Sequence, residues 1–327
     1  MGEMRLIEAV RQGLREELAA DSSVFLIGQD IGVNGGVFRV TDGLLDEFGP
    51  ERVIDSPLAE SGMVGVAIGA AMNGLRPVVE VQFADFIFPA FNQIVSEAAR
   101  MYYRTNGDYS VPIVIRAPYG GGVRGGLYHS QSVEAYFAHV PGLKVVVPSN
   151  PHDAKGLLKA AIRDNNPVLF FEHKLAYNTV QGDVPEGNYT VPIGKAAVRR
   201  EGQQLSLISY GLSVHHCLEA AETLAAEGIS CEVVDLRSVS PLDTKTLLES
   251  VKKTGRVCIV HEDNLTGGVG AEVAAIVAKD VFEYLDAPVQ RVAALDVPSF
   301  PYNPTLEDAL LPGPPDIISA ARELAAY

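Results

Sequence analysis

The chain has 327 residues, of which 47% are hydrophobic and 20% charged, so it is long enough for a large core and about two domains. No run approaches the roughly 18 apolar residues of a membrane span, and the net charge of −15 argues against binding to nucleic acid or anionic membranes. The N-terminus has no apolar signal region, so the expected location is cytoplasmic.

The first half of the chain alternates helical patterns with short apolar runs. Residues 4–20 have apolar side chains at helical spacing, and Val24–Gly28 then has the pattern of a buried strand. Further strands are expected at 78–82, 113–116, 144–147 and 168–171, and helices at 89–103 and 153–164. Continuous apolar strands separated by helices predict a parallel sheet with both faces covered.

Residues 177–192 are rich in Gly, Pro, Asn and acidic residues and lack periodicity, which predicts an interdomain linker. The alternation then resumes, with strands expected at 205–210, 231–236, 257–261 and 289–294, and helices at 214–227 and 270–282. The predicted fold is therefore α/β, with two domains of mainly parallel sheets flanked by helices. We place the domains at 1–185 and 186–327.

The charge of the second half of the chain and its cysteines limit the partners and the metal sites that we expect. Residues 191–327 carry 11 basic and 19 acidic side chains, which favours either simple solubility or a docking surface for a basic partner. Cys217, Cys231 and Cys258 are far apart and form no CxxC pair, so we expect reduced core cysteines and neither a disulfide framework nor a zinc site.

The segment 55–74, DSPLAESGMVGVAIGAAMNG, carries the first candidate for chemistry. Pro57 and the strand-like residues 52–54 place Glu60 near the start of a helix. Gly62, Gly65 and Gly69 give that helix a face of small residues. On its own, Glu60 needs no function, because the helix dipole stabilises a carboxylate in the first turn.

Four segments together change this interpretation. They are 55–74, EVQFADFIFPAFNQI at 80–94, LYHSQSVEAYFAHVPGLKVV at 127–146 and DAKGLLKAAIRDNNP at 153–167. In this order, and through residues 231–237 to the C-terminus, the chain resembles the β subunits of thiamine-diphosphate-dependent 2-oxo acid dehydrogenases, particularly the branched-chain type. The resemblance implies a thiamine-type pyrimidine-binding domain followed by a transketolase C-terminal-like domain.

The resemblance also implies roles for individual residues. Glu60 matches the catalytic glutamate that hydrogen-bonds the pyrimidine ring of thiamine diphosphate and shares a proton with it. Leu58, through its backbone, Gln82, and Phe86, through its ring face, match cofactor-binding positions. His129 matches an active-site histidine that assists acyl transfer to a lipoyl group, although a histidine at this place could equally belong to the loop before a helix at 130–138.

The diphosphate of such a cofactor is normally held through Mg²⁺ by a Gly-Asp-Gly motif with a later asparagine, and this chain has no such motif. The resemblance therefore implies an α subunit that supplies the Mg²⁺ ligands in an α2β2 assembly. A dihydrolipoyl acyltransferase core and its lipoyl domain are the further partners. A structural potassium ion, bound by backbone oxygens, is implied at Ile113, Val114, Ala161, Asp164 and Asn166.

Three positions depart from the family pattern. Gln29 stands where the family usually has an acid that is implicated in linking two active sites, and Asn178 replaces a common cationic residue. The acidic pattern of pyruvate-type relatives near Pro89 is also absent, which favours the branched-chain type. A pyruvate or acetoin dehydrogenase remains the nearest alternative, and Gln29 keeps open a scaffold subunit whose chemistry has lapsed.

An NAD-dependent oxidoreductase is the alternative from another class. Residues 120–125, GGGVRG, satisfy the GxGxxG pattern after a predicted strand. The pattern arises easily in a glycine-rich loop, and no helix begins directly after it, so we expect a loop that passes close to the active-site cleft. For the similar segment 266–270, TGGVG, we expect close packing in place of phosphate binding.

Overall fold

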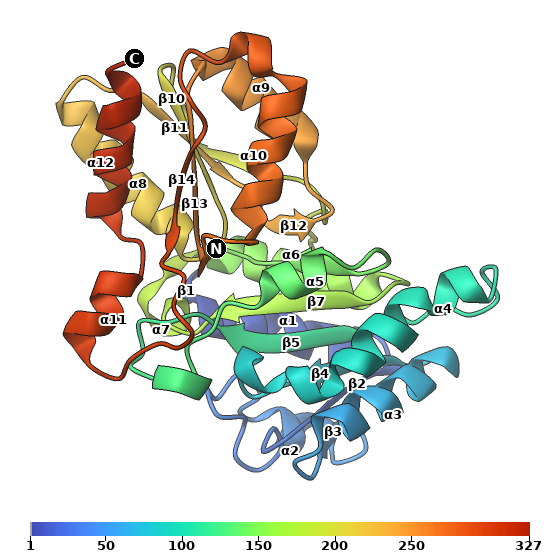
Figure 1. Cartoon of the computed structure of the whole chain (residues 1–327). Coiled ribbons are helices and arrows are strands. Elements are labelled where there is room, and N and C mark those ends of the chain that lie inside the picture. Colours follow the sequence, from blue (N-terminus) through green and yellow to red (C-terminus); the bar gives the residue numbers. More distant parts are fainter. Residues whose placement is uncertain (1) are drawn as a thin grey trace. The chain divides into compact units, whose positions relative to one another are not determined.

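The computed structural model describes residues 2–327, which divide into two compact units (Figure 1). Unit 1 comprises residues 2–119 and 136–193, and unit 2 comprises residues 120–135 and 194–327. This division differs from the predicted boundary after residue 185 in two ways. The observed boundary lies eight residues later, after residue 193. The glycine-rich loop with His129 belongs to unit 2.

Unit 1 is built on six parallel strands in the order β6-β7-β5-β4-β2-β3. The strands are β2 (Val24–Gly28), β3 (Val53–Asp55), β4 (Arg76–Glu80), β5 (Val114–Tyr119), β6 (Lys144–Val146) and β7 (Val168–His173). In β2, β5 and β7 every residue is buried, which explains why these strands are largely apolar and do not alternate polar with apolar residues. The predicted parallel sheet is therefore confirmed.

Helices cover this sheet. They are α1 (Leu6–Ala20), α2 (Leu44–Phe48), α3 (Glu60–Met72), α4 (Ala99–Arg104), α6 (Pro151–Arg163) and α7 (Ala176–Thr179). α5 (Glu134–Ala138) begins in unit 2 and ends in unit 1. Helices α1 and α6 pack closely, because Gly13 leaves room for the Leu158 side chain and the Lys155 backbone within 3.7 Å of where a Cβ would be.

The prediction of a linker at 177–192 was right only in part: the two units divide just after it, at residue 193, but its first half has regular structure. Residues 177–192 contain most of α7 and strand β8 (Gln181–Val184), which pairs antiparallel with β1 (Gly2–Arg5). Gly182 and Asp183 are poor strand formers, so the local sequence gave no sign of a strand whose partner lies at the N-terminus.

The predicted helix at 89–103 is confirmed as a helical segment, but it is not one regular α-helix. Two 3₁₀ turns, η1 (Ala84–Phe86) and η2 (Phe88–Ala90), precede a π-helical segment η3 (Gln93–Ala98) and then α4.

Unit 2 has a five-stranded sheet in the order β14-β13-β10-β11-β9, parallel except for β9. Its strands are β9 (Ala197–Arg200), β10 (Leu205–Ser209), β11 (Cys231–Asp235), β13 (Val257–Asn264) and β14 (Gln290–Ala294), with a short β12 (Ser238–Ser240) elsewhere in the unit. Its helices are η4 (Gly126–Tyr128), α8 (Ser213–Ala226), α9 (Thr244–Thr254), α10 (Val269–Asp280), η5 (Phe282–Tyr284), α11 (Pro304–Leu310) and α12 (Pro314–Ala325).

The three cysteines lie in the hydrophobic core of unit 2, between α8, α12 and the sheet. All three are buried and free, which confirms the prediction of reduced core cysteines. Burial raises the pKa of Cys231 to about 11 and that of Cys258 to about 12, so both remain protonated thiols at neutral pH.

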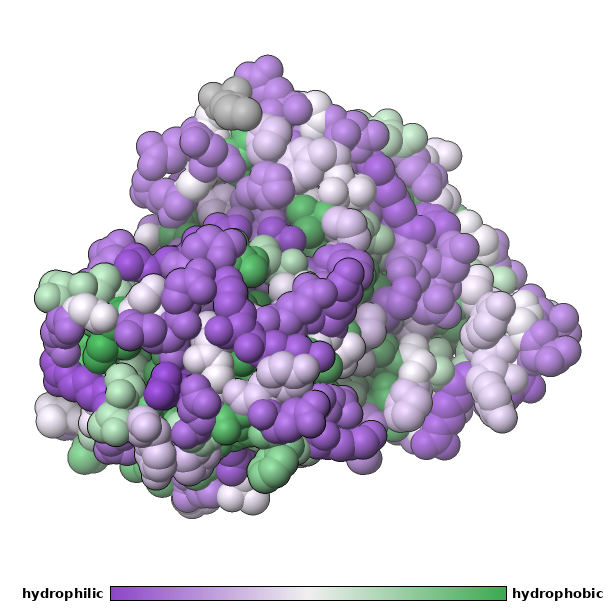
Figure 2. All heavy atoms as spheres, turned by 90° about the horizontal axis from the view of Figure 1, so that it is seen from above, coloured by the Kyte–Doolittle hydropathy of each residue, from purple (hydrophilic) through white to green (hydrophobic). Residues whose placement is uncertain are grey.

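The outer surface is strongly hydrophilic on the face drawn in Figure 2, where hydrophobic side chains form small, separate patches. Within residues 2–327, no helix combines the length and the apolar character that a membrane span requires.

Candidate functional site

The predicted cofactor residues of unit 1 follow the carboxyl ends of neighbouring parallel strands. Leu58 and Glu60 come after β3, and Gln82 and Phe86 come after β4. Strands β3 and β4 both pair with β2, so these segments leave the same edge of the sheet. In open α/β sheets this edge is where ligands bind. The structure therefore brings the four predicted positions to a place that suits a ligand.

Glu60 is the first residue of α3, as the sequence predicted. Its N-cap, Ala59, makes no side-chain cap, so the first amides of the helix are left for other partners. Glu60 is half-buried, and among residues 2–327 no partner holds its carboxylate. Leu58, two residues earlier, is 71% exposed, so both residues are accessible to a bound molecule.

Phe86 is the last residue of η1 and is half-buried. Its ring meets that of Phe83 edge to face, with centroids 5.5 Å apart. Nearby, the Gln82 amide donates a 3.1 Å hydrogen bond to Asp30, which follows β2 in the left-handed conformation. α3 packs against η2 and η3, the turns directly after Phe86. The helix of Glu60 and the segment of Phe86 are therefore neighbours.

A buried charged cluster lies beneath this edge, and sequence reasoning missed it. Arg116 of β5 pairs with Glu80 of β4 at 2.5 Å and with Glu172 of β7 at 2.7 Å. Tyr177 donates a 3.2 Å hydrogen bond to Glu172. Arg116, Glu172 and Tyr177 are completely buried, and Glu80 is 5% exposed. The available signal was a charged residue near the end of each of three otherwise apolar strands.

The electrostatics of this cluster are strongly perturbed. Burial raises the pKa of Glu172 to about 7, although the positive charge of Arg116 opposes the shift. The pKa of Arg116 is raised above its ordinary value by Glu172 and Glu80, against the effect of burial, so Arg116 stays charged. The cluster therefore has one fixed cation between two carboxylates, one of which titrates near neutral pH.

His129 belongs to unit 2 and is half-buried. It directly follows η4, and no helix covers residues 130–133, so the helix predicted at 130–138 is present only from Glu134. The backbone N–H of His129 donates a 3.4 Å hydrogen bond to the Gly126 carbonyl. The residue thus lies on a compact loop and is not a helix cap.

A second buried acidic cluster lies in unit 2. Glu134 is completely buried and accepts a 2.8 Å hydrogen bond from Tyr210. Burial, followed by the negative charge of Asp263, raises the pKa of Glu134 to about 8. Burial, with Glu262 adding to it, raises the pKa of Asp263 to about 6. His261 stacks near Tyr210, and burial lowers its pKa to about 4.

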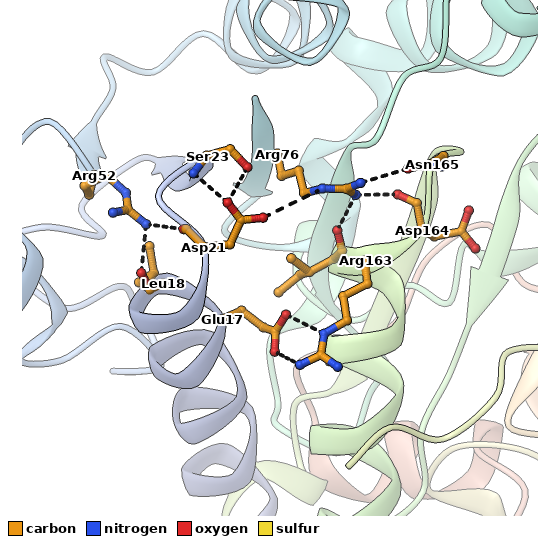
Figure 3. Close-up of polar contacts among 10 residues, drawn as sticks. Glu17, Leu18, Asp21, Ser23, Arg52, Arg76, Arg163, Asp164 and Asn165 are labelled. Carbon is orange, nitrogen blue, oxygen red and sulfur yellow. Dashed lines mark hydrogen bonds and ion pairs between the residues drawn. The ribbon is translucent and has the colours of Figure 1, made fainter. Parts of the chain in front are cut away.

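The expected potassium ligands lie in unit 1, and part of this region is shown in Figure 3. Their backbone oxygens are largely engaged: Ile113 accepts from Val168, Ala161 from Asp164 and Asp164 from Arg76. The Arg76 guanidinium also bonds the Ile162 carbonyl at 2.9 Å and the Asn165 side chain at 2.8 Å (Figure 3).

Lys144 adds a second positive charge at the Asp164 carboxylate. The Asn166 N–H bonds the same carboxylate at 2.9 Å. Two cationic side chains disfavour a further cation, although a carbonyl oxygen that accepts one hydrogen bond keeps a second lone pair. These residues fit a potassium ion only in part. Among residues 2–327, no group of three or more His, Cys, Asp or Glu side chains could hold a metal ion.

The glycine-rich loop at 120–125 does not offer its amides to a phosphate. The Gly121 N–H donates to Glu262 at 2.6 Å, and the Gly122 N–H donates to Glu307 at 3.0 Å. Both carboxylates would repel an anion. In the second glycine segment, Gly268 and Gly270 each lie so close to His261 that an added Cβ would clash, as expected for packing.

Two of the unusual positions also have defined neighbours. Gln29 follows β2 and is half-buried. The Asn178 side chain accepts a 3.1 Å hydrogen bond from Arg5, which also pairs with Glu8. A cation from the N-terminal segment thus contacts α7 at Asn178.

Comparison with known proteins identifies both halves of the chain. Residues 2–180 match the family described as "Transketolase, pyrimidine binding domain", and residues 194–317 match "Transketolase, C-terminal domain". The chain is 56% identical to the 2-oxoisovalerate dehydrogenase subunit beta of Bacillus subtilis (strain 168), with all of both chains aligned.

Pyruvate dehydrogenase E1 component subunits beta are also similar over the full length of both chains. The one from Bacillus subtilis (strain 168) is 48% identical, and the one from Staphylococcus aureus (strain Mu50 / ATCC 700699) is 47% identical.

Among solved structures, a "Split gene transketolase, inactive beta4 tetramer" aligns over 99% of both chains with a TM-score of 0.81 and 24% identity, which supports the fold alone. The full-length relatives, together with the two matched domains, show more than the fold. This chain belongs to the family of 2-oxo acid dehydrogenase β subunits.

Proposed function

We propose that this β subunit, together with an α subunit, catalyses the oxidative decarboxylation of a branched-chain 2-oxo acid and the transfer of the acyl group to a lipoyl group. The observation that carries the proposal is the placement of Glu60 at the start of α3, at the carboxyl edge of a parallel sheet. The name of the 56% identical relative supports a branched-chain substrate.

Thiamine diphosphate, when bound, supplies the carbon nucleophile and the electron sink for decarboxylation. Three features fit its pyrimidine ring: the free carboxylate of Glu60, the exposed backbone around Leu58 and the ring of Phe86. In the proposed mechanism Glu60 accepts a hydrogen bond from the pyrimidine nitrogen and holds a proton there. Gln82, which is hydrogen-bonded to Asp30, completes the cofactor-binding set.

His129 is proposed to assist the transfer of the acyl group to the lipoyl group. It is half-buried on a loop, and an imidazole ring can both donate and accept hydrogen bonds. If the role is correct, His129→Asn in the assembled enzyme lowers lipoyl acylation and spares decarboxylation measured with an artificial electron acceptor. Equal loss of both rates would contradict it.

The diphosphate-bound Mg²⁺ is assigned to the α subunit, because the Gly-Asp-Gly motif is missing from this sequence. The proposed assembly is α2β2. A potassium ion is also proposed to bind, at residues that fit it only in part. A higher thermal midpoint in K⁺ than in Na⁺ at equal ionic strength would support it, and equal midpoints would refute it.

The proposed partner of unit 2 is a basic peripheral domain of a dihydrolipoyl acyltransferase core. Unit 2 presents an apolar surface hollow of about 510 Å³ beside the C-terminus, lined by Phe282, Leu285, Pro288 and Tyr327 among others. Asp286 also lines it, and Glu283 of η5 lies next to Phe282 in the sequence. An apolar centre with acidic neighbours suits a small basic domain.

The substrate is tested by assaying the assembled α–β complex against 2-oxoisovalerate, pyruvate and 2-oxoglutarate. The proposal predicts the highest kcat/KM for 2-oxoisovalerate. An equal or higher value for pyruvate would replace the branched-chain assignment with a pyruvate-type enzyme. A stable complex with no activity on any of the three acids would favour the scaffold alternative.

A further inference from the structure

The loop that carries His129 is hydrogen-bonded to acidic residues of unit 2. We define the anchored loop as residues 120–132. Its two ends are joined by a 3.0 Å hydrogen bond from the Gly120 N–H to the Gln131 carbonyl. Gly120, Gly122, Arg124 and Gly126 all have positive φ, so this tight path depends on its backbone contacts.

Two buried carboxylates hold the first part of this loop. Glu262, at the end of β13, accepts the Gly121 N–H at 2.6 Å and the Ser132 hydroxyl at 3.4 Å, so it links both ends of the loop. Glu307 of α11 accepts the Gly122 N–H at 3.0 Å. Glu262 is 7% exposed, and Glu307 is completely buried. Hydrogen bonds from backbone amides to a buried carboxylate are strong, because one partner is charged.

Arg124 adds an ionic contact to the same acid. Its guanidinium lies 2.6 Å from Glu307 and 2.7 Å from Asp308. These two carboxylates raise the pKa of Arg124, Asp308 having the larger effect. The side chain is 38% exposed, whereas that of Glu307 is not exposed at all. Glu307 thus joins the loop backbone and the loop side chain in one place.

The loop residues next to Arg124 are in close contact with His129. At Gly125 an added Cβ would lie 2.7 Å from both the Cβ and the carbonyl oxygen of His129, so the two residues are in direct contact. At Gly126 an added Cβ would lie 2.4 Å from the Tyr302 ring. The short stretch from Arg124 to His129 therefore lies close to both Glu307 and Tyr302.

We propose that Glu307, with Arg124 and Glu262, positions His129 for acyl transfer. The inference rests on the proposed role of His129 in transferring the acyl group. Glu307 does not contact the reacting atoms; it fixes the backbone from which His129 projects. Loss of the Glu307–Arg124 contact lets the stretch from Arg124 to His129 shift, and small displacements of an active group cost large factors in rate.

The test uses the assembled α–β enzyme with its cofactors and two assays. One assay measures decarboxylation with an artificial electron acceptor, and the other measures acylation of a lipoyl domain. Glu307→Gln keeps an oxygen for the Gly122 N–H and removes the charge that holds Arg124. We expect it to lower the kcat of acylation about tenfold or more, with decarboxylation within about twofold of the wild type.

Arg124→Gln breaks the same contact from the partly exposed side, so it yields folded protein even if the Glu307 variant does not. It should give the same selective loss, and the double variant should lose less than the sum of the two single losses, because both changes remove the Glu307–Arg124 contact. Glu249→Gln is the control: this exposed carboxylate pairs with Lys245 on α9 of the same unit. It should leave both assays unchanged.

Three outcomes would overturn the inference. One is wild-type acylation in both single variants, and another is an equal fall of both activities, which indicates only lost folded enzyme. The third is additive losses in the double variant. His129→Asn separates this failure from that of the proposed function. If that variant keeps full acylation, the proposed role of His129 is wrong. If it loses acylation while the Glu307 and Arg124 variants keep it, only the proposed positioning by Glu307 and Arg124 is wrong.

Discussion

Phe86 stands at the end of a row of aromatic rings that begins in the buried charged cluster. Tyr177 contacts Phe38 with centroids 5.4 Å apart, Phe38 contacts Phe83 at 5.3 Å, and Phe83 contacts Phe86 at 5.5 Å. Lys174 lies over the Phe83 ring at 5.7 Å. A ring held in this way presents a fixed face, which favours stacking on a planar ligand.

Replacing this ring tests its proposed contact with the cofactor. Phe86→Leu removes the aromatic face and should raise the Kd for thiamine diphosphate in the assembled enzyme about 3- to 10-fold, as expected for the loss of about 1 kcal/mol of ring contact. Phe86→Tyr keeps the face and should stay within about twofold. A cofactor titration by fluorescence quenching measures both, and equal weakening by Leu and Tyr would exclude stacking.

Arg116 links three strands of unit 1, which makes it the cation with the largest expected effect on folding. Arg116→Gln leaves Glu80 and Glu172 buried without their cation and should lower the free energy of unfolding by about 3–5 kcal/mol. Arg15→Gln, which breaks an exposed pair with Glu47, is the matched control and should cost less than about 1 kcal/mol. Denaturant titration of the purified chain compares the two variants. Similar losses in the free energy of unfolding would mean that the buried ion pairs of Arg116 contribute little to folding.

At the scale of elements, β10, β13 and α5 meet around Glu134. Its pKa is about 8 in the folded chain against an ordinary value of 4.5, mainly because it is buried and secondly because Asp263 lies near it. Between pH 4.5 and 8, Glu134 therefore keeps its proton in the folded chain, whereas it has already lost that proton in the unfolded chain. The contribution of Glu134 to the free energy of unfolding should therefore fall as pH rises through this window, by up to about 1.4 kcal/mol per pH unit, while the lowered pKa of His261 acts in the opposite direction below pH 6.5.

Glu134→Gln removes this titration and keeps an oxygen for the Tyr210 hydroxyl. We expect the variant to lose less stability than the wild type between pH 5.5 and 8, measured by denaturant titration at both values. The remaining slope should include Asp263, whose pKa is raised to about 6, with Glu262 as a further neighbouring carboxylate. Parallel pH dependences in both proteins would show that Glu134 does not hold the proton.

The sequence predicted those elements whose signal is local. Buried strands such as β5 and β7 are largely apolar, and α3 begins at Glu60 shortly after a short strand and Pro57. β1 and β8 were not predicted, because each strand is stabilised only by pairing with the other. The two strands lie near opposite ends of the sequence of unit 1. No local pattern encodes such a pairing.

The site shows the same limit. Glu60 and Phe86 were found because they lie in recognisable motifs. Glu307 was not found, because its partners, Gly122 and Arg124, are more than 180 residues away. Arg116 could have been found, since a charged residue in an apolar strand requires a buried partner.

At the scale of the whole molecule, the net charge of −15 sets how the chain meets its partners. Binding of a basic acyltransferase domain to the assembled enzyme should weaken steeply between about 50 and 500 mM salt, because screening shortens the range of attraction. Calorimetric titration across this range measures the effect. An affinity that does not change with salt would leave only the apolar hollow beside Tyr327 as the basis of docking.

The proposed association with an α subunit is the other property of the whole molecule, so the proposed chemistry of Glu60 is tested within that assembly. Glu60→Gln keeps the size of the side chain and removes the carboxylate that is proposed to hold a proton at the pyrimidine nitrogen. Glu51→Gln, an exposed acid in the turn before β3, is the matched control and should behave like the wild type.

The measurement is the steady-state decarboxylation rate of the assembled Glu60→Gln enzyme at saturating thiamine diphosphate, together with the Kd of that cofactor. We expect a fall in kcat of about 100-fold or more, as is typical when a general acid–base group is removed, with cofactor binding within about tenfold of the wild type. A variant that binds the cofactor and keeps its decarboxylation rate within about threefold would contradict the central claim.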